Sequence, residues 1–148
     1  MADSTHSHPL AVLKFQEYLR INTAHPTPDY KSSTEFLLSY GEELGLSCKT
    51  LEYVAGKPLV LFTLPGTSKD KGSILLNSHV DVVPVTEELW NFPPFGAEIS
   101  DGKIYARGTQ DMKSVGIQHL EAIRKIKECN VLCFLCFCAN CLLSWHHP

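Results

Sequence analysis

The sequence predicts an α/β fold of the three-layer sandwich type, in which a mostly parallel central sheet has helices on both faces. Two segments with the apolar spacing of helices come first, strongly apolar strands occupy the middle, and a further amphipathic helix follows them. A length of 148 residues suits one domain. The elements are too few for a complete sandwich, so we expect its amino-terminal part only.

The first two helices are expected at residues 9–21 and 30–44. Residues 9–21 place leucine, tyrosine and isoleucine on one side and charged residues on the other. A turn with two prolines separates the helices, because proline disfavours a helical conformation in the residue before it. Asp29 is a candidate N-cap for the second helix, and Gly45 stands where a glycine ends one.

Strands are expected at residues 48–54, 59–64 and 73–77, with a short one near Ile104. The second and third are nearly continuous apolar runs, which are typical of strands covered by helices on both faces. The third helix is expected at residues 112–127. Its predicted buried stripe is Val115, Leu120, Ile123 and Ile126.

Composition narrows the class of function. The apolar fraction is 44%, and 13 Lys+Arg face 16 Asp+Glu, giving a net charge of −3. These values indicate a soluble globular domain without nucleic acid as a partner. Residues 1–8 are expected to be a flexible N-terminus and lack the apolar core of a secretory signal. Residues 131–143 are too short to span a membrane. A cytoplasmic location is therefore expected.

His79 and Asp81 follow the apolar strand at residues 73–77 directly. Residues two apart on an extended chain point to one side, roughly 6.6 Å apart. Asp81 could therefore accept a hydrogen bond from one ring nitrogen of His79 while the other nitrogen binds a metal. Ligands of open α/β sheets also bind at the carboxyl ends of strands. Alternatively, both residues cap a loop.

A second candidate lies about thirty residues later, in the segment Tyr105–Lys113. A glycine-bearing turn there delivers Asp111 to the start of the third helix. The carboxylate could cap that helix, bind a cation, or do both. Arg107, in the same segment, is expected to pair with an acidic residue rather than with a substrate.

Residues 78–84 (SHVDVVP) and 105–113 (YARGTQDMK) resemble signatures of the aminoacylase/carboxypeptidase family of dinuclear zinc metallohydrolases. The resemblance covers about residues 10–128 and makes residues 9–128 the first part of a catalytic domain. It implies zinc-dependent hydrolysis of N-acyl L-amino acids, which are small-molecule substrates, with two zinc ions. The resemblance also implies that members of the family are homodimers, and we expect their dimerisation domain to have no counterpart in this sequence.

The same resemblance implies roles for three residues. His79 is expected to be a ligand of one zinc ion, and Asp111 the carboxylate that bridges both. Asp81 is placed in the catalytic site as the residue that orients His79. The peptide after the bridging aspartate is often cis in this family, so the Asp111–Met112 bond is a candidate for that conformation.

The resemblance also shows what is missing. Family members carry a Glu-Glu pair after the next strand, with one glutamate acting as general base, and no such pair follows Asp111. Zinc normally takes three or four protein ligands, so we expect this chain alone to be inactive or at best weakly active. The alternatives are another deacylase or dipeptidase of the superfamily, and a non-catalytic truncated isoform.

Residues 129–148 are expected to be a divergent Cys-rich tail, because five of the six cysteines lie there. Two C-x-x-C pairs, Cys133/Cys136 and Cys138/Cys141, are separated by one residue, whereas zinc ribbons need about 15–20. A metal-buffering module built on these cysteines is a third alternative. The apolar run in this tail is also compatible with a further strand.

Overall fold

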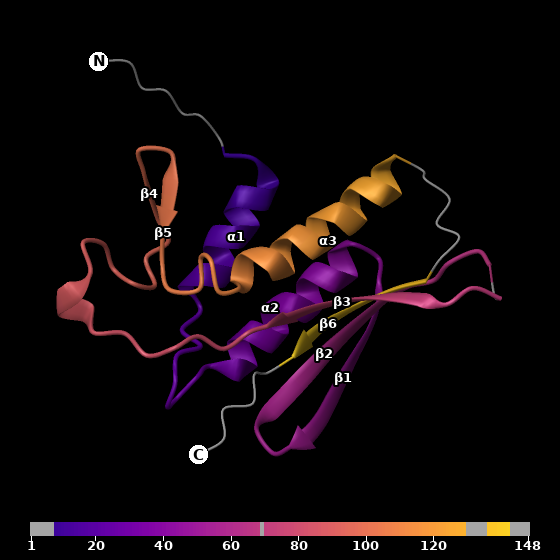
Figure 1. The fold of residues 1–148 in the computed structure, drawn as a ribbon, viewed down its shortest axis with the longest axis horizontal. Coiled ribbons are helices and arrows are strands. Elements are labelled where there is room, and N and C mark those ends of the chain that lie inside the picture. Colours follow the sequence, from indigo (N-terminus) through magenta and orange to yellow (C-terminus); the bar gives the residue numbers. More distant parts are fainter. Residues whose placement is uncertain (1–7, 69, 130–135, 143–148) are drawn as a thin grey trace.

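We describe a computed structural model of the chain, covering residues 8–68 and 70–129 in full and residues 136–142 as backbone (Figure 1). Outside this description lie residues 1–7 of the predicted flexible N-terminus (residues 1–8), residue 69, residues 130–135 and 143–148, and the side chains of both C-x-x-C pairs. The elements, in chain order, are α1 (Leu10–Arg20), α2 (Tyr30–Glu43), β1 (Ser47–Val54), β2 (Lys57–Leu64), β3 (Ser73–His79), the 3-10 helix η1 (Glu87–Leu89), β4 (Glu98–Ser100), β5 (Lys103–Tyr105), α3 (Lys113–Glu128) and β6 (Cys136–Leu142).

The predicted helix ends are largely confirmed, since local chemistry sets them. Asp29 is the N-cap of α2, and its side chain accepts a hydrogen bond from the Ser32 amide at 2.9 Å. Gly45 ends that helix with a φ of 62°, in the left-handed region that glycine adopts without strain. Both helices therefore begin and end within a residue or two of the predicted positions.

The main sheet has the strand order β1-β2-β6-β3. β1 and β2 form an antiparallel hairpin, β6 pairs antiparallel with β2, and β3 pairs parallel with β6. The strand predicted as possible in the tail is therefore present as backbone, and it lies between strands made much earlier in the chain. β4 and β5 form a separate hairpin, of which only β5 is predicted by the sequence.

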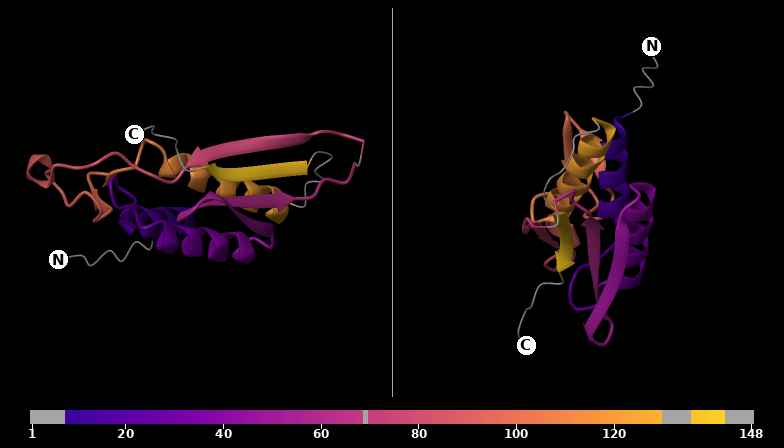
Figure 2. Two further views of the ribbon diagram at one scale, coloured as in Figure 1. Left: turned by 90° about the horizontal axis from the view of Figure 1, so that it is seen from below. Right: turned by 90° about the vertical axis from the view of Figure 1, so that its right-hand side faces the viewer.

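The α/β class is confirmed, and the described residues form two of the three predicted layers (Figure 2). All three helices share one buried cluster with one face of β2, where Val60 and Phe62 are 2% and 1% exposed. On β3, by contrast, Leu75 is 62% exposed. Of the three strand pairings in the main sheet, one is parallel. The apolar strands predicted at residues 59–64 and 73–77 are therefore covered by helices on one face, and the described residues supply no helical layer on the other.

The stripe predicted for α3 is half right. Leu120 and Ile123 are 1% exposed, whereas Val115 and Ile126 are only partly buried. The buried face is instead completed by three other residues at helical spacing, namely Lys113, Gly116 and Ile117. No helix among the described residues is long and apolar enough to cross a membrane.

Candidate metal centre

His79 is the last residue of β3, so it stands at the carboxyl end of a sheet strand as predicted. The preceding residue, Ser78, is 2% exposed and faces α3, where a Cβ added to Gly116 would lie 3.0 Å from the Ser78 hydroxyl. Because successive side chains of a strand point to opposite faces, His79 turns away from the helices. The alternation of β3 therefore directs the imidazole toward the open end of the sheet.

Asp111 reaches the same place through the turn before α3. Gly108 has a φ of 91°, and a Cβ there would lie 2.9 Å from Val82 Cγ1, so a glycine lets this turn pass close to the segment after β3. The N-cap of α3 is Met112, and it makes no side-chain capping bond. The Asp111–Met112 peptide is cis, as the resemblance implies. Asp111 therefore does not act as the N-cap.

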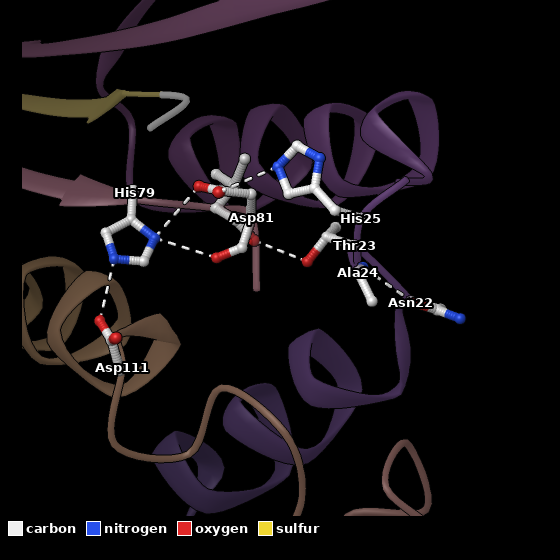
Figure 3. Close-up of polar contacts among 8 residues, drawn as sticks. Asn22, Thr23, Ala24, His25, His79, Asp81 and Asp111 are labelled. Atoms are coloured by element: carbon white, nitrogen blue, oxygen red, sulfur yellow. Dashed lines mark hydrogen bonds and ion pairs between the residues drawn. The ribbon is translucent and has the colours of Figure 1, made fainter. Parts of the chain in front are cut away.

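The two predicted ligands meet (Figure 3). His79 Nε2 lies 2.9 Å from Asp111 Oδ1, although the residues are 32 positions apart in sequence. On the other side of the ring, Nδ1 lies 2.9 Å from the Asp81 carbonyl oxygen and 3.2 Å from Asp81 Oδ1. The hydrogen bond to Asp81 raises the pKa of His79 to about 9, against the effect of burial and with a contribution from Asp111. The imidazole is therefore held between two carboxylates.

His25 joins this group, although nothing in its sequence surroundings indicates a role. Its Nε2 lies 3.3 Å from Asp81 Oδ2, so the Asp81 carboxylate, with a side chain 5% exposed, stands between two imidazoles. The missed residue lies in the turn between the first two helices, just before a cis proline bond. Because that turn has no periodicity, only tertiary structure brings it to Asp81.

Lys113 holds the turn of Asp111 against α1. Its side chain is 0% exposed, and Nζ donates hydrogen bonds to the carbonyls of Tyr18 and Ile21 at 3.0 and 2.7 Å. The ammonium group also lies 4.7 Å from the centre of the Tyr18 ring. Burial lowers the pKa of Lys113 to about 7, while the carbonyls and the ring stabilise its charged form. Lys113 thus anchors the start of α3 to the carboxyl-terminal end of α1.

The donor set suits a divalent cation in part. With neutral imidazoles, His25, His79, Asp81 and Asp111 carry two negative charges, and imidazole and carboxylate are both ligands that zinc accepts. The Asp111 side chain is 82% exposed, which leaves the gap between it and His79 open. Within the described ranges, however, no group of three His, Cys, Asp or Glu side chains could hold a metal ion. The site therefore supplies two candidate ligands.

The loop after β3 forms a cavity of about 520 Å³ of its own, lined by residues 87 and 90–96. The Arg107 guanidinium lies 5.0 Å from the centre of the Trp90 ring, and Phe92 stacks on Tyr105. Arg107 Nε is buried without a hydrogen-bond partner in the described structure. Arg107 therefore stacks on an aromatic ring, and none of its described contacts is the acidic pairing expected from the sequence.

Comparison with known proteins supports the resemblance. Residues 75–139 match the model of "Peptidase family M20/M25/M40", which extends past the predicted limit near residue 128. Aminoacylase-1 of Mus musculus is 52% identical over 126 residues, which are 84% of this chain and 31% of that protein. Aminoacylase-1 of Homo sapiens is 50% identical over 121 residues, 81% of this chain and 29% of that protein. The chain thus spans about a third of these relatives' length.

Solved structures show the same fold. An M20 family metallo-carboxypeptidase from Sulfolobus solfataricus has a TM-score of 0.81 at 26% identity, covering 91% of this chain and 31% of its own. Human carnosine dipeptidase 1, at 20% identity, has a TM-score of 0.73 over 89% of this chain and 31% of its own. Through these matches, the chain is homologous to the aminoacylase-1 proteins over most of its length, and its residues 75–139 match the model of peptidase family M20/M25/M40.

Proposed function

We propose that this chain forms the first part of the zinc site of an amidohydrolase that cleaves N-acyl L-amino acids to a carboxylate and a free amino acid. The observation that carries the proposal is the 2.9 Å contact between His79 Nε2 and Asp111 Oδ1, with Asp81 behind the ring. Two ligand types that suit zinc meet at a strand end, where α/β enzymes bind their ligands. Identity near 50% to aminoacylase-1 supports the substrate class.

In this proposal, His79 and Asp111 would hold zinc: His79 would be a ligand of one ion, and Asp111 would be shared between that ion and a second. Asp81 orients the His79 ring, because a hydrogen bond on one imidazole nitrogen fixes which nitrogen remains available to a metal. When bound, zinc would polarise the acyl carbonyl and lower the pKa of a water molecule. The described residues would hold the zinc and orient its histidine ligand. We assign none of them as the general base.

The same proposal covers the wider setting. We infer a small-molecule substrate, a cytoplasmic location, and neither nucleic acid nor a membrane as partner. The relatives' names also include a probable carboxypeptidase, 45% identical over a shorter segment of 73 residues. The longer matches at higher identity favour aminoacylase chemistry over peptidase chemistry. A non-catalytic form that associates with a whole subunit remains the alternative.

Zinc titration of the 148-residue chain tests the metal site. We expect weak binding, since two ligands are fewer than zinc normally takes, and a loss of about 100-fold or more in His79→Ala and in Asp111→Ala. His119→Ala, on α3, is the matched control and should bind as the wild type does. Binding that survives both site variants but disappears when Cys133, Cys136, Cys138 and Cys141 are changed to serine would favour the metal-buffering alternative.

Hydrolysis of N-acetyl-L-methionine with added zinc tests the reaction. We expect a rate near zero for the chain alone, because no general base is assigned, and His79→Ala should abolish any rate that is present. A rate insensitive to His79→Ala would contradict the proposed site. If the chain is inactive yet co-purifies with a full-length aminoacylase subunit, the non-catalytic alternative is favoured.

A further inference from the structure

The turn between α1 and α2 lies alongside the chain that follows β3. Ala24 and Val82 form a parallel bridge, and the amide of Val82 donates to the Thr23 carbonyl at 3.0 Å. The His25 amide donates to the Val82 carbonyl at 3.3 Å, and the buried Thr23 hydroxyl donates to the Val80 carbonyl at 2.6 Å. Residues 23–25 are therefore fixed against both neighbours of Asp81 (Figure 3).

This arrangement gives each oxygen of the Asp81 carboxylate an imidazole. Oδ1 lies 3.2 Å from His79 Nδ1, and Oδ2 lies 3.3 Å from His25 Nε2. A carboxylate turns readily about its last torsion angle, which has broad preferences. A donor on Oδ2 restricts that rotation and keeps Oδ1 directed at His79. The backbone bonds of residues 23–25 hold the donor itself in place.

We propose that His25 is a positioning residue for the metal site: it fixes the Asp81 carboxylate, which fixes the His79 imidazole and thereby the Nε2 atom that faces Asp111. The inference rests on the proposed function, because His79 matters here as a zinc ligand. His25 acts through Asp81 and His79, so two residues stand between it and the cation. A direct partner of a metal-ligating histidine, such as Asp81, typically changes metal affinity by about 10–100-fold, and a residue that acts through that partner should lie at the lower end of this range.

The competing explanation is that His25 only packs the turn, and two substitutions distinguish it. His25→Leu keeps a comparable volume and removes the donor. His25→Gln places an amide N–H close to the position of the imidazole Nε2 and so keeps the donor. A packing role predicts that the two variants behave alike or that leucine is better. A positioning role predicts that glutamine restores what leucine loses.

The experiment measures zinc affinity of the 148-residue chain by competition with a chelating dye, and its melting temperature. We expect His25→Leu to bind zinc about 10-fold more weakly, His25→Gln to bind within about threefold of the wild type, and His119→Leu to be unchanged. Equal zinc affinities for wild type, leucine and glutamine variants would overturn the proposal. So would an equal loss in both variants.

A second readout needs no metal. In the wild type, the His79 Nδ1 proton is held in a hydrogen bond to Asp81, so its NMR resonance should be protected from exchange with water. The Asp81 carbonyl oxygen, 2.9 Å from Nδ1, remains a partner in either variant. We therefore expect the resonance to shift and its protection to fall in His25→Leu, and both to stay near the wild-type values in His25→Gln. A wild-type shift and wild-type protection in both variants contradict the positioning role, even if the leucine variant is too unstable for the titration. Zinc binding that is indifferent to His79→Ala would instead overturn the proposed function.

Discussion

Charged side chains gather in two regions of this molecule, and they are arranged in opposite ways. A cluster that we term the helix clamp joins all three helices and consists of Lys14, Tyr40, Glu43, Glu121 and Arg124. In it, the Arg124 side chain is 17% exposed. Its Nη2 lies 2.7 Å from Glu43 Oε1, and its Nε lies 2.9 Å from Glu121 Oε1. At the proposed metal centre, the Asp111 side chain is 82% exposed, and its polar side-chain contact within the described residues is with His79.

The two regions differ in charge balance and in solvent exposure. The helix clamp balances two cations against two carboxylates, and Tyr40 adds a ring beneath Lys14 and Arg124. Its charges are satisfied within the fold. The metal centre has an excess of carboxylates and leaves one of them open to solvent. A charge that is enclosed and paired inside the fold supports stability, whereas an exposed carboxylate is accessible to a cation.

The comparison is sharpest between a buried lysine and an exposed one, and the largest expected effect lies there. Lys113→Ala should lower the free energy of unfolding by about 3 kcal/mol, because it removes a buried stem and leaves the carbonyls of Tyr18 and Ile21 without their donor. Lys31→Ala, whose side chain is 86% exposed, should change it by less than about 0.5 kcal/mol. Urea denaturation measures both. Equal effects would contradict the assignment of Lys113 as an anchor.

An intermediate effect is expected from pH. The pKa of His79 is raised from 6.5 to about 9, so its contribution to stability is complete below pH 6.5 and is lost as pH rises through 9. The metal-free chain should therefore lose about 2–3 kcal/mol relative to His79→Gln across that range. Denaturation at a series of pH values gives this difference. His119→Gln is the control, because burial lowers the pKa of His119 and moves its window below 6.5.

The smallest effect is expected in the helix clamp. The bonds to Lys14 and Arg124 lower the pKa of Glu43, whose side chain is still 38% exposed. Glu43→Gln should therefore reduce stability at pH 7 by no more than about 1 kcal/mol, and the difference should shrink as pH falls below 4.5 and the wild-type carboxylate takes up its proton. Zinc affinity should not change. A zinc defect in this variant would show that the two regions are coupled.

Much of this structure could be predicted from local pattern, and the rest could not. Two features could be predicted: the capping of α2 by Asp29 and the meeting of Asp111 with His79. Helix capping, strand alternation and family motifs can all be recognised in the sequence. The roles of His25 and Lys113 could not be predicted in this way, since a histidine in a turn and a lysine near the start of a helix are usually exposed. Their roles depend on backbone carbonyls and a carboxylate supplied by distant segments. β4 was likewise too short to show a period.

The position of β6 bears on how the chain folds during synthesis. In the described sheet, β3 is joined to the β1–β2 hairpin through β6, which leaves the ribosome after all the other described elements. The hairpin and the helices can gather early, but the backbone bonds of β3 must wait for their partner. Until then, the strand bearing His79 presents unpaired amides and an apolar edge. A nascent chain stalled before residue 136 should therefore be a substrate for chaperones that recognise such strands.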